Sequence, residues 1–166
     1  MQLNHKERLR RAIRHEPVDR LPTQINYTGA VGERLAAHFG VTRADLPNRL
    51  GNHLLRVDIS HTPRLSDDGK VTYDWWGAGF DTEEEGYFIR HSPLAENQDL
   101  DAFPWPDPHA PGLLRDAERA IAADAGQHFV APNFGFALFE RAYTLRGFDT
   151  FLADMALDPE FAGELL

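Results

Sequence analysis

Apolar residues recur at helical spacing in several segments of the chain, and recognisable start and stop signals flank these segments. Asn4, followed by Glu7 three positions later, predicts a helix that begins after Asn4 and ends before Pro17. The apolar positions that follow residue 29 predict a second helix, which Gly40 caps. By the same criteria we expect helices over residues 42–50, 112–126, 136–146 and 150–157, and one more that begins at Asp158.

Short, mostly apolar runs over residues 21–26, 53–59 and 128–133 predict strands between these helices. Because strands and helices alternate, we expect parallel strands joined by crossover helices. Three strands are too few for a closed barrel, which takes about 250 residues. The pattern therefore fits either a small open α/β sheet or the first part of a barrel.

An excursion from about residue 60 to 111 interrupts this alternation. Residues 71–76 and 86–91 predict two strands of a hairpin-like structure, which is rich in aromatic residues such as Trp75 and Trp76. These aromatic residues either cover a flat ligand or hold the hairpin together as a small satellite core, and we favour the core.

Composition and charge narrow the class of protein. Hydrophobic residues make up 42% and charged residues 26% of the chain, which is typical of a globular protein. The net charge of −9 argues against a nucleic-acid partner, and the basic positions 6, 8, 10, 11 and 14 are interpreted as a solvent-exposed helix face. No apolar run approaches the roughly 20 residues of a membrane helix. We expect a cytoplasmic protein that binds a small-molecule substrate and neither nucleic acid nor membrane.

Candidate site residues follow from the strand ends, because barrel enzymes carry their chemistry at the carboxyl ends of the strands. Asp58 can orient His61 for general acid–base catalysis; alternatively, Asp58 caps a turn and His61 is a surface residue. The other strand ends offer Asn26, Tyr27, Asn133 and Phe134 as substrate-binding residues, although asparagine is also a common turn residue. Without cysteine, and with no histidine pair at ligand spacing, we expect these residues to bind no metal or other cofactor.

Three stretches in this order resemble the uroporphyrinogen decarboxylase superfamily. They are residues 4–22, residues 99–108 with the sequence DLDAFPWPDP, and the set 133–136, 146–149 and 158–160. The resemblance covers only about the first half of a family member. It implies that residues 1–166 form a single incomplete domain, the N-terminal part of a (β/α)8 barrel with about three parallel strands. The final Leu165-Leu166, without a cap or polar tail, also favours a truncated chain.

That superfamily contains cofactor-independent uroporphyrinogen decarboxylases and methyltransferases that transfer a methyl group from a corrinoid to a thiol with zinc. The decarboxylases carry an Arg-Gln-Ala-Gly-Arg stretch after the first strand, whereas residues 24–29 here contain no arginine. The Asp58-Ile59 pair also lacks the setting of the decarboxylase aspartate. The resemblance therefore favours a methyltransferase whose zinc and corrinoid sites lie in the missing half.

Two alternatives stay open at this point. One is a decarboxylase that acts on a porphyrinogen-like polyacid, and the other is a small, complete α/β binding module without enzyme activity. If the chain is half a barrel, we expect it to be inactive alone. Its exposed barrel edges would then favour homo-oligomers or aggregation.

Overall fold

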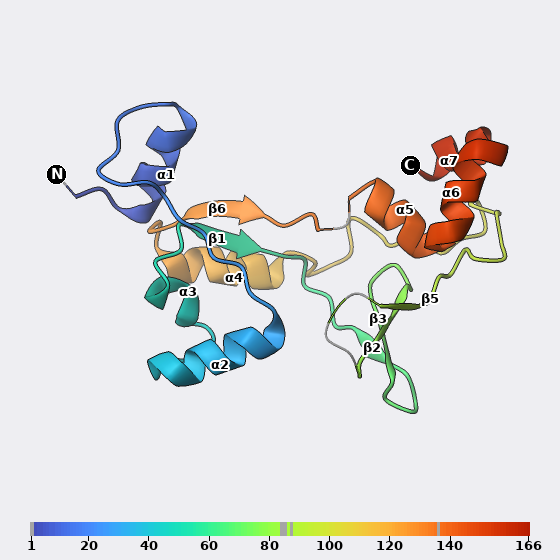
Figure 1. Ribbon diagram of the computed structural model, residues 1–166, viewed down its shortest axis with the longest axis horizontal. Coiled ribbons are helices and arrows are strands. Elements are labelled where there is room, and N and C mark those ends of the chain that lie inside the picture. The colour runs from blue at the N-terminus through green and yellow to red at the C-terminus, as the bar shows by residue number, and fades with distance from the viewer. Residues whose placement is uncertain (1, 84–85, 87, 136) are drawn as a thin grey trace. The chain divides into compact units, whose positions relative to one another are not determined.

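The computed structural model describes residues 2–83, 86, 88–135 and 137–166, and the chain divides into two units (Figure 1). The first unit consists of Met1–Ser60 and Leu114–Asn133, and the second of His61–Leu113 and Phe134–Leu166. The fold is mixed α/β, with a small parallel sheet in the first unit and an antiparallel sheet in the second. Within the described residues these sheets do not close into a barrel.

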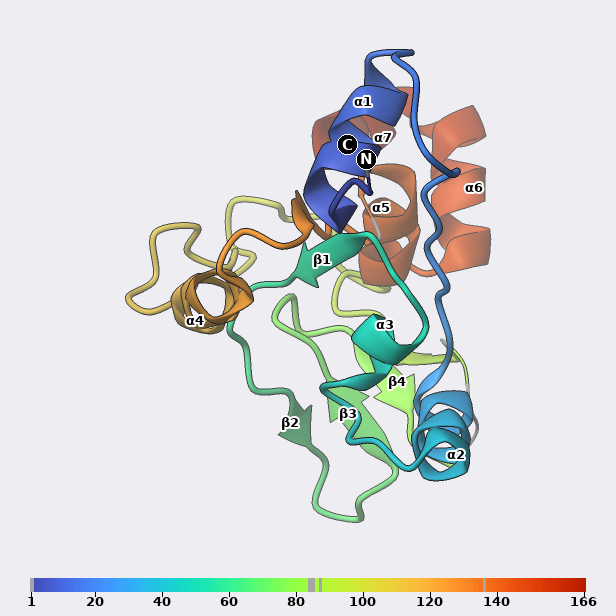
Figure 2. The same cartoon turned by 90° about the vertical axis from the view of Figure 1, so that its left-hand side faces the viewer.

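A pair of parallel strands forms the centre of the first unit. Strand β1 (Leu54–Val57) pairs in register with β6 (Phe129–Pro132). Helix α4 (Arg115–Asp124) packs against β1, and helix α1 (His5–Ile13) packs against β6. In Figures 1 and 2 α1 lies above the strands and α4 below them. The predicted combination of parallel strands and a crossover helix is thus present for these two strands.

Helix boundaries in the first unit follow the capping residues of the sequence. The Asn4 side chain accepts a hydrogen bond from the Glu7 amide at 2.8 Å and begins α1, as predicted. Helix α2 (Gly29–Phe39) ends at Gly40, whose φ of 63° is the left-handed conformation that favours glycine. Helix α3 spans only Leu46–Arg49, shorter than the predicted 42–50.

The strand predicted over residues 21–26 is absent, and the parallel sheet of the described residues has two strands instead of three. The segment nevertheless lies beside the start of β1. The Asn52 side chain accepts a hydrogen bond from the Ile25 amide at 2.9 Å and donates one to the Ile25 carbonyl at 3.1 Å. Gln24 Oε1 in turn accepts from the Leu54 amide at 3.1 Å. One backbone hydrogen bond remains, from the His53 amide to the Thr23 carbonyl at 3.1 Å, and side-chain amides replace the rest of the ladder that a strand would require.

Arg8 is buried, in contrast to the solvent-exposed face predicted for the basic residues of this helix. Its guanidinium donates to both carboxylate oxygens of Asp19, at 2.7 and 2.9 Å, and to the Leu3 carbonyl. A further contact of 3.0 Å joins Arg8 Nη1 to Nε2 of His53. The Arg8 guanidinium holds the pKa of Asp19 well below its usual range. Arg8 therefore fixes the segment after α1 against the rest of the unit.

We predict that the first unit loses stability as the pH falls, because burial lowers the pKa of His53. A depressed pKa means that this stability is fully present above the unfolded value of about 6.5 and is lost as the pH falls through the folded value. Hydrogen exchange of the β1 and β6 amides, corrected for intrinsic exchange rates, measures the stability of the first unit at each pH. The His53→Gln variant should show a weaker dependence of stability on pH, whereas His38→Gln, which replaces an exposed histidine, should leave that dependence unchanged. If stability falls equally steeply with pH in the wild type and in both variants, His53 is not the cause.

The antiparallel sheet of the second unit has four strands in the order β2-β3-β4-β5. These are β2 (Arg64–Leu65), β3 (Val71–Tyr73), β4 (Gly79–Asp81) and β5 (Ile89–His91). The predicted two-stranded hairpin is wrong, because β4 lies between β3 and β5 and pairs with both. The Asp74 carboxylate accepts hydrogen bonds from the amides of Trp76 and Ala78 and so forms the turn that ends β3. Residue 87 of the predicted second strand lies outside the described residues.

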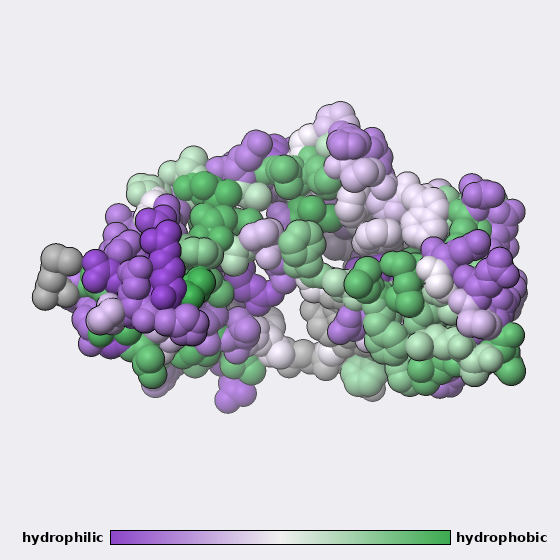
Figure 3. Space-filling model, turned by 90° about the horizontal axis from the view of Figure 1, so that it is seen from above, coloured by the Kyte–Doolittle hydropathy of each residue, from purple (hydrophilic) through white to green (hydrophobic). Residues whose placement is uncertain are grey.

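Three helices complete the second unit: α5 (Phe139–Arg146), α6 (Phe148–Leu157) and α7 (Pro159–Leu165). Their core contains Ala142, Phe151 and Ala162. Figure 3 shows hydrophobic residues gathered where these helices lie. Asp158 accepts a hydrogen bond from the Phe161 amide at 3.3 Å and begins α7, as predicted, while residue 136 of the predicted α5 lies outside the described residues.

No helix in the described part of the chain has the length and apolar character needed to cross a membrane.

Candidate functional site

A hydrogen-bonded cluster of polar side chains lies at the carboxyl ends of β1 and β6. Arg56 Nη2 donates to Asn133 Oδ1 at 2.7 Å, and Arg56 Nη1 donates to Asn26 Oδ1 at 3.3 Å. Asn133 Nδ2 donates to Asp58 Oδ1 at 2.6 Å. We call Asn26, Arg56, Asp58 and Asn133 the polar cluster.

The parallel register brings these residues together. Val57 pairs with Pro132, and the Asn133 amide donates to the Val57 carbonyl at 2.8 Å, so the two chains stay adjacent for one more residue. Asp58 and Asn133 therefore leave the sheet side by side. Asn26 comes from the segment that Asn52 holds beside β1 through Ile25. The structure thus brings together three of the residues that the sequence indicated, Asn26, Asp58 and Asn133.

Arg56 links these residues, and the sequence analysis did not name it as a site residue. A signal for it exists: it is the charged residue within the apolar run of β1, close to the carboxyl end of the strand. Both of its hydrogen bonds go to neutral amide oxygens, and it forms no ion pair within the part of the chain that the structure describes. The guanidinium is exposed and keeps N–H donors that the two amides do not use.

The polar cluster borders a cavity of about 340 Å³. Asn26, Tyr27, Arg56 and Asp58 line one part of it, and the remaining lining residues are Gln24, Ile25, Pro47, Asn52, Leu54 and Leu55. The volume lies within the range of small-molecule sites, about 300–1,000 Å³. An arginine held by two amides can bind one carboxylate with two N–H groups, whereas the negative charge of the neighbouring Asp58 opposes anions, and most strongly those with several charges.

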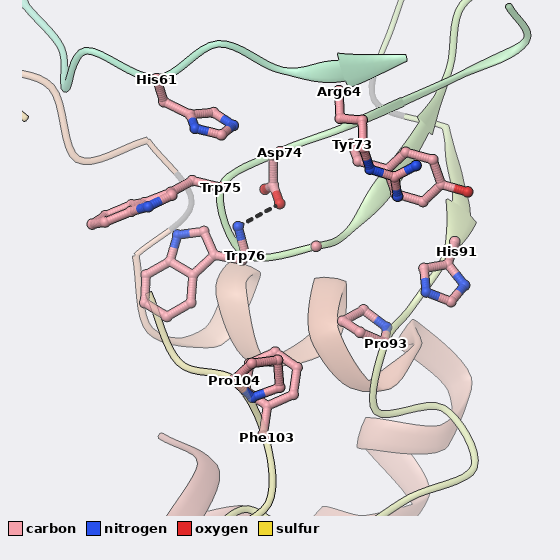
Figure 4. Close-up of a pocket in the computed structure, with 11 residues that line it drawn as sticks. His61, Arg64, Tyr73, Asp74, Trp75, Trp76, His91, Pro93, Phe103 and Pro104 are labelled. Atoms are coloured by element: carbon pink, nitrogen blue, oxygen red, sulfur yellow. Dashed lines mark hydrogen bonds between the residues drawn. The ribbon is translucent and has the colours of Figure 1, made fainter. Parts of the chain in front are cut away.

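His61 and Phe134 belong to the second unit, while Asp58 belongs to the first. Phe134 is 78% exposed. His61 lines a pocket in the second unit together with Trp75 and Trp76 (Figure 4). Acid–base catalysis by an Asp58–His61 pair stays a prediction. In the structure, the Asp58 carboxylate accepts a hydrogen bond from the Asn133 side chain.

Among the residues that the structure describes, no group of three or more His, Cys, Asp or Glu side chains is arranged to hold a metal ion. The chain matches no protein-family model, no curated protein and no solved structure.

Proposed function

We propose that the chain is the N-terminal part of a (β/α)8-barrel enzyme of the uroporphyrinogen decarboxylase superfamily, on its methyltransferase side. In this proposal the enzyme transfers a methyl group from a corrinoid to a thiol, and the polar cluster binds the small-molecule acceptor. Two features support it: β1 and β6 are parallel strands with a helix packed on them, and polar side chains gather at their carboxyl ends.

The single observation that carries the proposal is Arg56 at the strand ends with neutral partners. One guanidinium, with a carboxylate two residues further along the chain, fits a substrate that carries one anionic group. A porphyrinogen polyacid would instead require several cations around it. The polar cluster therefore supports a substrate with a single anionic group at this edge, which in the methyl-transfer proposal is the thiol acceptor.

The described residues do not fit a zinc site, because no three ligands converge and the sequence has no cysteine. The proposal accordingly places zinc and corrinoid on residues outside this chain and assigns no step through them here. The residues of this chain bind and orient the acceptor. Arg56 binds its anionic group, Asn26 and Asn133 hold the guanidinium, and Asn133 also fixes Asp58.

Exposed apolar side chains on α6 provide further support for a larger barrel. Leu152, Met155 and Leu157 are 43%, 46% and 84% exposed. Exposed apolar faces of helices commonly pack against another part of the protein or against a partner. In the proposal they contact later parts of the barrel.

An assay of the protein expressed from its complete native gene tests this function. We expect it to consume methylcobalamin with 3-mercaptopropionate as acceptor, and with a KM about tenfold higher for the uncharged 2-mercaptoethanol, because only the first thiol can pair with Arg56. Release of CO₂ from uroporphyrinogen would instead support the decarboxylase alternative. Absence of both reactions would contradict an enzyme of either branch and favour the binding module.

A further inference from the structure

The second unit contains a pocket that combines indole rings with an exposed arginine (Figure 4). Its volume is about 450 Å³. Figure 4 shows Trp75 and Trp76 on one side and Arg64 with Tyr73 and His91 on the other. The remaining lining residues are His61, Asp74, Gly77, Pro93, Phe103 and Pro104.

The aromatic side of this pocket is held in place by its neighbours. The Trp76 ring contacts Trp75 edge-on, with centroids 6.0 Å apart, and contacts Trp105 at 6.3 Å. The guanidinium of Arg141 lies 5.1 Å from the Trp76 ring centroid. Such contacts limit the motion of the indole, so that little conformational entropy remains to be lost when a flat ring stacks on this side.

Two of the residues that line the pocket, Asp74 and Arg64, carry a full charge, and they differ in whether the described residues supply a counter-ion. Asp74 is neutralised by Arg141, whose Nη1 lies 2.6 Å from its carboxylate, and two backbone amides also donate to Asp74. Arg64 forms no ion pair within the described residues.

The Arg64 guanidinium stacks on Tyr73, 4.0 Å from the ring centroid. Stacking covers the face of the guanidinium and leaves the N–H groups at its edge available for a carboxylate.

We propose that this pocket binds a small planar aromatic carboxylate, with its ring against Trp75 and Trp76 and its carboxylate on the edge of Arg64. The indoles favour a flat ring over an aliphatic one of similar size. Arg64 selects for the negative charge, and the planar carboxylate matches the fork of N–H donors. The site is separate from the polar cluster, since all its lining residues belong to the second unit.

NMR titration of the 166-residue chain, followed through the indole N–H signals, tests the proposal. The probe is 1-naphthoate, which we expect to bind saturably below ~10 mM. Its neutral analogue 1-naphthalenemethanol and the non-aromatic cyclohexanecarboxylate should each bind about tenfold more weakly.

Two matched variants assign the charge selection to one residue. Arg64→Gln should weaken 1-naphthoate binding about tenfold and abolish the preference over the alcohol. Arg49→Gln removes another exposed arginine stacked on a ring, Phe39 in the first unit, and should leave binding unchanged. The proposal is overturned by equal affinity for 1-naphthoate and the alcohol, by unchanged binding in Arg64→Gln, or by the absence of saturable binding. Because Arg64 is exposed, its replacement should preserve the fold, which the dispersion of the amide spectrum checks.

Discussion

Replacing Arg146 by methionine is expected to lower the free energy of unfolding of the second unit by about 3–5 kcal/mol, because it leaves a buried charge unpaired. Arg146 Nε lies 2.6 Å from the Asp154 carboxylate, and the two side chains are only 9% and 12% exposed. Arg146 Nη1 also donates to the carbonyls of Leu94 and Ala95, at 2.6 and 3.0 Å. One guanidinium thus connects α5, α6 and the segment after β5.

Urea unfolding followed by tryptophan fluorescence measures this loss, because Trp75, Trp76 and Trp105 all lie in the second unit. Lys70→Met is the matched control: Lys70 and its partner Glu83 are 60% and 63% exposed, so the change should be below about 1 kcal/mol. Replacing both Arg146 and Asp154 by apolar residues should recover part of the loss, since no buried charge then remains. An Arg146→Met protein as stable as Lys70→Met would show that the ion pair does not hold the unit together.

Local signals were sufficient to predict the ends of several elements. Asn4, Gly40 and Asp158 cap helices at the positions that the sequence predicted, because a cap depends on residues within one helical turn. The strands at 54–57 and 129–132 were predictable for a similar reason, since each is a short apolar run between helices.

The remaining features depend on contacts between distant residues. Arg8 looked solvent-exposed because its partner Asp19 lies 11 residues away and His53 45 residues away. Residues 21–26 looked like a strand, but most of their hydrogen bonds beside β1 involve side chains, chiefly that of Asn52.

The order of the antiparallel sheet was also not predictable from the sequence pattern, because β4 is only three residues long and offers no periodicity to detect. In the candidate site, the strand-end rule indicated Asn26, Asp58 and Asn133. It did not reveal Arg56, whose partner Asn133 is 77 residues away.

Removal of the Arg56 guanidinium is expected to weaken binding of an anionic thiol at the polar cluster by about ten- to a hundredfold. This is the affinity that a charge-assisted hydrogen-bonded pair typically contributes. Arg56 is the cation at this edge, and Asn26 and Asn133 hold it in place without neutralising it. Arg56→Gln keeps a polar side chain of similar length and removes the charge. Asp58→Asn keeps Arg56, removes the neighbouring negative charge, and should leave binding intact or strengthen it.

The most direct measurement is an NMR titration of the 166-residue chain with 3-mercaptopropionate, followed at the side-chain Nε–H of Arg56. Arg49, an exposed arginine of the same unit, serves as the internal control in the same spectrum. The account predicts a saturable shift at Arg56 that 2-mercaptoethanol does not produce, that Asp58→Asn retains, and that has no counterpart at Arg49. Equal, unsaturable shifts at Arg56 and Arg49 would contradict an anion-binding site at the carboxyl ends of β1 and β6.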